Sequence, residues 1–206
     1  MCLPALRLLE ASGYTPALVG KRWAEDLMAG MGWRFDPITG HVSEDLKRIR
    51  YLAQNAGAAK GLLFPNSLGS ALLFKFGQIE SAEAIKAWGG TPAWDKVPKN
   101  LGLLLLKRHE AAAKNLMEKY SIPKRYAVLA PIARGLQDGQ NKCWAHFNDL
   151  VGPLRNIGIE PIVFPNKEEA DAARKACPEA SIYEPTSLGN FAAIVKHAQF
   201  VIANDS

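Results

Sequence analysis

The segment YAVLAPIARG at residues 126–135 joins a short apolar run to a loop that contains proline, glycine and small residues. The apolar run predicts a buried strand over 126–130, because strands of a parallel sheet are covered on both faces. The same rhythm continues downstream: we expect strands at 160–164 and 199–203, and helices at 145–156, 167–176 and 188–197. Short strands that alternate with helices favour an α/β fold with a doubly wound parallel sheet.

The first half of the chain shows a weaker version of this alternation. We expect a strand at 61–64 that Pro65 ends, and helices over 4–11, from Ser43 onward, from Asn66 or Ser67 to residue 76, and over 107–120. Residues 77–105 lack a clear period, and we interpret them as a join. The sequence therefore predicts two Rossmann-like, parallel-sheet units, residues 1–105 and residues 106–206.

Both ends of the sequence differ from those of a complete doubly wound domain. The chain opens on a helix, where such a domain usually opens on a strand, and it ends at Ser206 directly after a strand. Ligands of this fold bind just beyond the carboxyl ends of the strands, and a domain seldom stops there. We therefore expect both sheets to be incomplete and the 206 residues to be a fragment.

The composition is that of an ordinary globular protein, with 48% hydrophobic and 22% charged residues. The longest apolar runs are far shorter than the roughly 20 residues that a membrane-spanning helix needs. The N-terminus lacks the pattern of a signal peptide. The three cysteines of the chain are widely separated and form no metal-binding spacing. We expect a soluble, cytoplasmic protein.

The net charge of +5 permits binding to an anionic partner. Residues 101–125 carry six basic and two acidic side chains. A solvated helix face explains this stretch, and contact with an anionic surface is the other explanation. No aromatic side chains alternate with the basic ones, so the stretch does not resemble a platform for single-stranded nucleic acid. We expect no nucleic-acid partner.

Candidate ligand-binding residues follow three of the expected strands, where a parallel sheet binds its ligands. They are Asn66, Ser67 and Ser70 after the first strand, Ala133, Arg134, Gly135 and Lys142 after the second, and Asn204, Asp205 and Ser206 after the last. Backbone N–H groups and a lysine in such a loop could hold a diphosphate. Helix capping would explain the first and third stretches equally, and a solvated loop would explain the second.

Other kinds of chemistry lack support in the sequence. The four histidines are scattered without metal-binding spacing, so we expect no metal site. The glycine spacings of a Walker loop and of a dinucleotide-binding fingerprint are absent, and we expect no cofactor. The adjacent acids at 44–45 and 168–169 point to different sides of a helix and make poor acid–base pairs.

Taken in order, several motifs resemble those of the family 9 glycosyltransferases. The family carries an early L-P-A-L-R helix, a strand ending in P-N-S-x-x-S-A-L, a P-G-A…K-R-W loop and a strand ending in N-D-S-G. The corresponding residues are 3–7, 65–72, 131–133 with 142–144, and 204–206. The ordered set spans nearly the whole chain and is similar to the lipopolysaccharide heptosyltransferase branch.

The resemblance implies a GT-B architecture, with an acceptor-binding unit at 1–105 and a donor-binding unit at 106–206. It also implies inverting transfer of heptose from ADP-heptose to the lipopolysaccharide inner core, at the cytoplasmic face of the inner membrane. The donor would contact Ala133, Arg134, Gly135, Lys142, Glu168, Asn204, Asp205 and Ser206, and the acceptor would contact Asn66, Ser67 and Ser70. The family's general base, an aspartate, would precede Met1, so we expect no sugar transfer by these 206 residues alone.

The sequence departs from the family pattern at two positions of the donor side. Ile132 replaces the glycine of P-G-A, which we expect to crowd the approach of the donor, and Pro165 replaces a glycine after the following strand. The catalytic residues stay unassigned. The alternative to an enzyme is a non-catalytic or degenerate Rossmann-like module that binds a nucleotide or a sugar.

Overall fold

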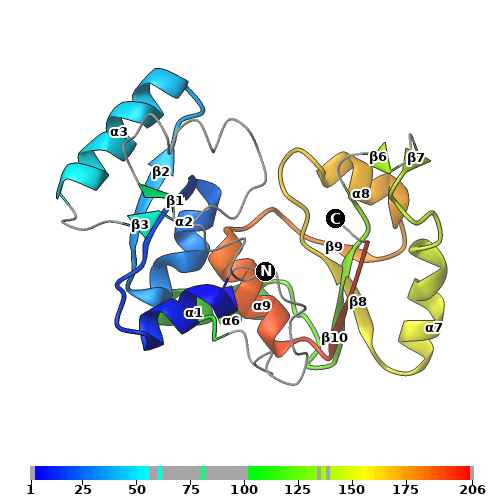
Figure 1. Ribbon diagram of the computed structural model, residues 1–206. Coiled ribbons are helices and arrows are strands. Elements are labelled where there is room, and N and C mark those ends of the chain that lie inside the picture. The colour runs from blue at the N-terminus through cyan, green and yellow to red at the C-terminus, as the bar shows by residue number, and fades with distance from the viewer. Residues whose placement is uncertain are drawn as a thin grey trace. The chain divides into compact units, whose positions relative to one another are not determined.

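The computed structural model describes residues 3–55, 60–61, 80–81, 102–133, 136–137 and 140–204 (Figure 1). The chain divides into two compact units, Met1–Leu104 and Leu105–Ser206. Of the expected elements, most of the strand at 61–64 and the helix after Asn66 lie outside the described residues.

The second unit is built on a four-stranded parallel sheet with the order β10-β5-β8-β9. Its strands are β5 (Tyr126–Ala130), β8 (Glu160–Val163), β9 (Ser181–Ile182) and β10 (Phe200–Ala203). In the register, Tyr126 lies opposite Glu160, and Ala127 lies opposite Phe200. The predicted strands at 126–130, 160–164 and 199–203 and their parallel direction are therefore confirmed. The two-residue β9 was not predicted, because it lacks an apolar run.

Helices cover both faces of this sheet, and alternate side chains of β5 point into two different cores. Tyr126 and Val128 point into a core with α6 (Lys107–Lys119) and α9 (Leu188–His197). Leu129 points into the opposite core, with α7 (Val151–Asn156) and α8 (Ala170–Ala176). Successive side chains of a strand alternate between faces, so β5 can serve both cores at once. Figure 1 shows α7 and α8 on one side of the sheet and α9 on the other.

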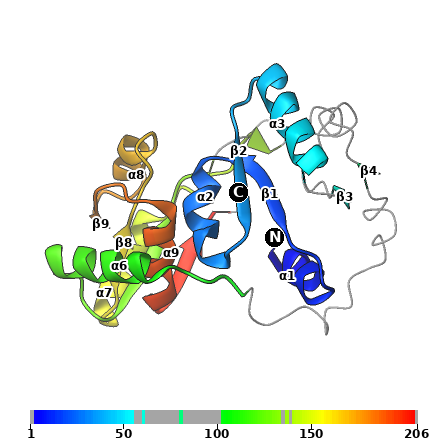
Figure 2. The ribbon, with the colours of Figure 1, turned by 90° about the vertical axis from the view of Figure 1, so that its left-hand side faces the viewer.

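The helices α6 and α9 lie side by side (Figure 2). They are joined by Glu110, whose carboxylate contacts Lys196 Nζ at 2.7 Å and His197 Nε2 at 2.9 Å. Hydrogen bonds from Lys196 and then His197 outweigh partial burial and lower the pKa of the Glu110 carboxyl. The predicted helices 107–120 and 188–197 are confirmed to within one residue.

Two predicted helices begin later in the structure than in the sequence analysis. Residues 145–147 form a turn, and the expected helix at 145–156 begins with the 3-10 helix η3 (Asn148–Leu150), followed by α7. Gly158 then ends α7 with a φ of 72°, and its neighbour Ile159 donates a hydrogen bond back to the Leu154 carbonyl. Glycine favours this left-handed position after a helix. The start of α8 is delayed to Ala170, because Lys167–Glu169 form a turn in which Asn166 Oδ1 accepts the Glu169 N–H.

The first unit contains a parallel pair of strands that the sequence analysis missed. They are β1 (Ala17–Lys21) and β2 (Arg34–Ile38), with Ala17 opposite Arg34. The connection runs through α2 (Trp23–Met28) and the 3-10 helix η1 (Ala29–Met31). Helix α1 (Leu3–Ala11) precedes the pair and α3 (Val42–Asn55) follows it, and a second parallel pair joins β3 (Lys60–Gly61) to β4 (Glu80–Ser81). In Figure 2, α2 and α3 lie on opposite sides of β1 and β2.

The turn between β2 and α3 is organised by a buried carboxylate. Asp45 is only 3% exposed, and it accepts hydrogen bonds from the N–H groups of Thr39 and Gly40 and from the Thr39 hydroxyl. Burial by itself raises the pKa of the Asp45 carboxyl, but these hydrogen bonds outweigh burial and lower it. A negative charge near the N-terminus of α3 is also favoured by the helix dipole. Asp45 therefore fixes the point at which α3 begins.

Among the described helices, none is both long and apolar enough to cross a lipid bilayer.

Candidate functional site

The connection order of the second sheet creates a topological switch point. From β5 the chain moves to β8 and β9 on one side, and then returns to β10 on the other side of β5. The carboxyl ends of β5 and β10 are neighbours, with Ala130 opposite Ala203. In open parallel sheets, ligands bind in the crevice that forms where the strand order reverses. The candidate site is therefore the edge of the sheet beyond Ala130 and Ala203.

Asn204 joins three segments at this edge of the sheet. Its backbone N–H donates to the Ala130 carbonyl at 3.3 Å. Its side-chain Nδ2 donates to the Pro131 carbonyl at 2.6 Å, and its Oδ1 accepts the Trp144 N–H at 2.8 Å. One residue thus joins the end of β10, the loop after β5 and the segment that leads into η3.

A second set of contacts lines up the same two segments. The Cys143 thiol lies 3.2 Å from the Ala133 nitrogen, whose N–H donates to it, and 3.5 Å from the Ala133 carbonyl. Lys142 is half-buried directly beside these contacts. The segment 142–144 therefore lies beside the loop 131–133, and Lys142 is at the start of this segment.

Trp144 adds an aromatic surface at the same edge. Its indole is 47% exposed, and it packs edge-on against the buried Phe147 with ring centroids 5.4 Å apart. Phe147 belongs to the core beneath α7 and α8. The indole is thus anchored to the core through Phe147, and Trp144 as a whole is left about half in contact with solvent.

Glu168 lies on the same edge of the sheet, in the turn that follows β8. It is exposed, and the turn is held by Asn166. Because β8 is the parallel neighbour of β5, the two loops leave the sheet in the same direction. Pro165, which replaces a glycine of the family pattern, is buried in this loop.

The structure brings together three of the predicted donor-site residues, Ala133, Lys142 and Asn204, and it places Glu168 at the same edge of the sheet. The other predicted site residues lie outside the described part of the chain: Arg134, Gly135, Asp205 and Ser206 on the donor side, and Asn66, Ser67 and Ser70 on the acceptor side. Cys143 and Trp144 belong to the loop motif, but the sequence alone assigned no role to either residue. Their position directly after Lys142 was the available signal.

The side chain of Ile132 takes a position that the sequence analysis did not expect. It is partly buried and packs against the core cluster that contains Leu129, Phe147 and Val163. Isoleucine at this position therefore contributes to the core beneath the loop. Its packing gives no support to the expectation that it crowds the donor.

An ion pair lies at the opposite edge of the sheet. Glu160, at the start of β8, contacts Arg155 Nη2 at 2.8 Å and accepts a hydrogen bond from the Ser181 hydroxyl. The hydrogen bond from Arg155 is the main cause that lowers the pKa of Glu160, and the one from Ser181 adds to it. These groups lie at the amino ends of the strands, so we assign them a structural role. No cluster of three metal-binding side chains occurs among the residues that the structure describes.

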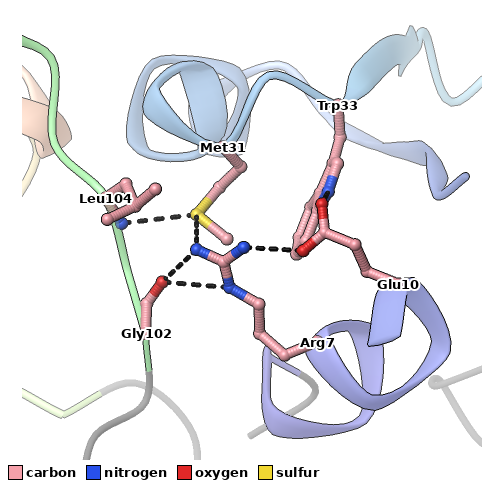
Figure 3. A network of polar contacts seen from close by, with 6 residues as sticks. All are labelled: Arg7, Glu10, Met31, Trp33, Gly102 and Leu104. Carbon is pink, nitrogen blue, oxygen red and sulfur yellow. Dashed lines mark hydrogen bonds and ion pairs between the residues drawn. The ribbon is translucent and has the colours of Figure 1, made fainter. Parts of the chain in front are cut away.

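In the first unit, the L-P-A-L-R helix contributes a polar network around Arg7 (Figure 3). The guanidinium donates to the Gly102 carbonyl from Nη2 at 2.8 Å and from Nε at 3.3 Å, and it pairs with Glu10 at 2.6 Å. Glu10 also accepts the indole N–H of Trp33 at 2.9 Å. The bond from Trp33, followed by that from Arg7, lowers the pKa of Glu10.

Met31 extends this network toward the end of the unit. Its sulfur lies 3.9 Å from Arg7 Nη2 and accepts the N–H of Leu104 at 3.3 Å. Arg7 therefore ties helix α1 to the loop at 31–33 and to the segment 102–104, where the first unit ends. Within this unit, the arginine of the motif is a structural residue.

Comparison with solved structures identifies the fold. The chain is similar to E. coli ADP-heptose LPS heptosyltransferase II, with 17% identity and a TM-score of 0.67 over 99% of this chain and 74% of that one. It is also similar to a family 9 glycosyl transferase from Veillonella parvula (13% identity, TM-score 0.69, 100% and 72% covered). A third match is the E. coli heptosyltransferase WaaC with ADP-2-deoxy-2-fluoro heptose (14% identity, TM-score 0.55, 99% and 78% covered). The predicted GT-B class, with two Rossmann-like parallel-sheet units, is thereby confirmed.

Sequence comparison finds a match to a protein family but none to an individual curated protein. A search of curated proteins finds no match to the chain. The sequence model of glycosyltransferase family 9 (heptosyltransferase), in contrast, matches residues 93–206, which include the whole second unit and the candidate crevice. The chain therefore belongs to glycosyltransferase family 9, as the motif resemblance predicted.

Proposed function

We propose that this protein transfers heptose from ADP-heptose to the inner core of lipopolysaccharide, and that the switch-point crevice of the second unit binds the donor. The observation that supports this proposal most directly is the meeting of Lys142, Trp144 and the loop 131–133 at the carboxyl ends of β5 and β10. The family and the donor analogue named with WaaC make a nucleotide sugar the natural ligand of such a crevice.

Each side chain at the crevice suits one part of an ADP-sugar. The ammonium of Lys142 supplies a mobile positive charge for the diphosphate. The Ala133 N–H is held by a thiol, which is a weak acceptor, so a phosphate oxygen can replace it with a stronger bond. The exposed indole of Trp144 offers a flat apolar surface for adenine. The carboxylate of Glu168 can accept hydrogen bonds from the ribose hydroxyls.

The transfer that we propose is an inversion at the anomeric carbon of the heptose. An acceptor hydroxyl attacks this carbon from the face opposite the diphosphate. The new C–O bond forms as the bond to the phosphate oxygen breaks, and ADP leaves with the electron pair. A base takes the proton of the attacking hydroxyl, and we assign none of the described residues to that role. Positive charge and N–H donors around the departing diphosphate stabilise the charge that develops there.

We further propose that residues 1–105 bind the acceptor, through Asn66, Ser67 and Ser70, and that residues 106–206 bind the donor. On the donor side the proposal includes Arg134, Gly135, Asp205 and Ser206 beside the residues already described. Because we assign the general base of this transfer to none of the described residues, we propose that residues 1–206 alone transfer no sugar. An assay with ADP-heptose and a heptose-deficient core acceptor tests it.

Binding of ADP is the sharpest test of the donor site. We expect Lys142→Ala to raise the Kd for ADP about tenfold or more, because one hydrogen bond to a charged group typically contributes about 1.5–3 kcal/mol. Isothermal titration calorimetry on the wild-type chain and the variant measures this change. The matched control is Lys175→Ala, which removes the same charge from the exposed last turn of α8. Helix α8 starts beyond the carboxyl end of β8 and packs back along the sheet, so Lys175 is remote from the crevice.

The outcomes separate the competing explanations. Equal weakening by the two substitutions would mean that Lys142 acts only through the net charge. Failure of the wild-type chain to bind ADP would contradict the donor site itself. Binding of ADP without heptose transfer, also by a chain extended with residues that supply a general base, would favour the non-catalytic module over the enzyme.

We also propose peripheral contact with an anionic membrane through the basic stretch 101–125, which places the reaction at the cytoplasmic face of the inner membrane. All six basic side chains of this stretch are exposed: Lys107, Arg108, Lys114, Lys119, Lys124 and Arg125. Each contributes about 1 kcal/mol near such a surface, and salt weakens the attraction.

Vesicle sedimentation tests this contact. We expect the chain to sediment with vesicles that contain phosphatidylglycerol and to be released by added salt. The double substitution Lys119→Ala with Lys124→Ala should weaken binding about tenfold or more, since two charges near the surface are removed. Binding to neutral phosphatidylcholine vesicles of the same strength, or binding that salt leaves unchanged, would contradict an electrostatic contact.

A further inference from the structure

Both polar groups of the Asn204 side chain bond to the protein's own backbone, although its position suggested a ligand contact. Its Nδ2 donates to the Pro131 carbonyl at 2.6 Å and its Oδ1 accepts the Trp144 N–H at 2.8 Å. These partners are 73 and 60 residues away in the sequence. A primary amide is the side chain that presents a donor and an acceptor side by side, and only one orientation of it satisfies both partners.

The two partners of Asn204 use opposite backbone groups: Pro131 accepts with its carbonyl, and Trp144 donates its N–H. Pro131 has a fixed φ and no N–H of its own, so the carbonyl is the backbone polar group through which the chain can tether this residue. Trp144 lies where the segment 142–144 turns into the exposed residues 145–146, and its N–H is held by the Asn204 oxygen. An alanine at 204 would release both. An aspartate would place an oxygen against the Pro131 carbonyl, where two acceptors repel each other.

We infer that Asn204 is a positioning residue, which aligns Lys142 and Trp144 with the loop 131–133 so that both can reach a nucleotide diphosphate. The inference rests on the donor site proposed above. The bond from Ala133 N–H to the Cys143 thiol fixes the middle of segment 142–144 against the loop, and Asn204 fixes its end. Lys142 is thereby held by the residues that follow it, while the residues before it form β7 (Gln140–Asn141), which pairs with β6 (Leu136–Gln137). The carboxamide acts through these residues and does not need to touch the donor.

The first part of the test needs no ligand. In Asn204→Ala we expect the amide of Trp144 to exchange its hydrogen about tenfold faster or more, while the amides of Val128 and Ile162 in the sheet keep their protection. The matched control is Asn148→Ala. Asn148 also bridges another segment of the unit, since it accepts the Glu179 N–H at 3.1 Å and donates to the Glu179 carboxylate at 3.2 Å. This control should leave the exchange of Trp144 unchanged.

The second part measures the coupling between Asn204 and Lys142 in the binding of ADP. We expect Asn204→Ala to raise the Kd for ADP about tenfold. In that background, Lys142→Ala should add less than about a threefold increase, because the lysine is no longer aligned. A purely structural role of Asn204 would move the thermal midpoint and leave the effect of Lys142→Ala at its full size.

The two readouts keep this inference apart from the proposed donor site. Unchanged exchange of Trp144 in Asn204→Ala, or additive effects of the two substitutions on Kd, would overturn the positioning role. If the wild-type chain binds no ADP, the proposed donor site is wrong. The positioning role is then wrong as well, even if the exchange of Trp144 responds as expected. Faster exchange together with non-additive Kd values supports the inference.

Discussion

Replacing Tyr126 with alanine is expected to destabilise the second unit by about 4 kcal/mol, in the range found when a large aromatic residue is removed from a core. Tyr126 is 0% exposed, and its ring packs in the core that α6 and α9 form with the sheet. Its hydroxyl donates to the Ile194 carbonyl at 2.6 Å. That carbonyl lies in the last turn of α9, where Ala198 donates its N–H to Val195 instead. Tyr126 therefore fills the core and caps the end of a helix.

Tyr126→Phe separates these two contributions. It keeps the ring and removes the hydroxyl, so we expect a loss of about 1–2 kcal/mol, because a buried carbonyl is left without its donor. Urea denaturation followed by circular dichroism measures the loss. Exchange of the amides of Val128 and Ile162 assigns it to the second unit. The control Tyr51→Phe removes a hydroxyl from a side chain that is 59% exposed and should cost less than about 0.5 kcal/mol.

The buried phenol also predicts a loss of stability at high pH. Burial raises the pKa of Tyr126 to about 12, from the ordinary value of 10.0. The neutral phenol is favoured by the folded state, so its contribution is complete below pH ~10 and is lost as the pH rises towards 12, by about 1.4 kcal/mol per unit. Phenylalanine does not titrate, so the advantage of the wild type over Tyr126→Phe should shrink above pH ~10 and vanish near pH ~11. An advantage that stays constant up to pH ~11 would show that Tyr126 titrates as an exposed tyrosine does.

The fold of the second unit could be predicted because its strands are covered on both faces. Strand β5 is buried at Tyr126, Ala127, Val128 and Leu129, and such a run is visible in the sequence without any tertiary information. Strands β1 and β2 gave no such signal. In β1 the residues alternate between exposed and partly exposed, and β2 contains Pro37, which lacks the N–H of a regular ladder.

The sequence predicted where the site lies, but it did not predict the contacts between the segments that form it. Lys142, Ala133 and Asn204 were found because each follows an expected strand, and the carboxyl ends of parallel strands meet at one edge. The role of Asn204 could not be found in this way, because its partners Pro131 and Trp144 are 73 and 60 residues distant. A local pattern contains no information on which segments a loop residue will reach. The inward packing of Ile132 is likewise a property of the core beneath the loop.

The second large effect is expected at Gly102, in the network of Figure 3. Gly102→Ala should destabilise the first unit by about 3 kcal/mol for two separate reasons. Gly102 has a φ of 69°, which costs a residue with a Cβ about 1–2 kcal/mol. An added Cβ would also lie 3.2 Å from Arg7 Nε, and it would push away the guanidinium that binds the Gly102 carbonyl. Chemical denaturation of the variant measures the sum of both effects.

Gly13 and Arg7 allow the two causes to be measured separately. Gly13 has a φ of 86°, and a Cβ added there meets nothing within 4 Å, so Gly13→Ala should cost only the backbone contribution of about 1–2 kcal/mol. In an Arg7→Ala background the guanidinium is gone, and Gly102→Ala should then cost no more than Gly13→Ala does. The excess in the wild-type background is the coupling free energy between residue 102 and Arg7, that is, the part of the Arg7 interaction that the added Cβ removes. If both glycine substitutions cost the same with Arg7 present, the arginine moves aside without loss, and it does not hold the end of the first unit in place.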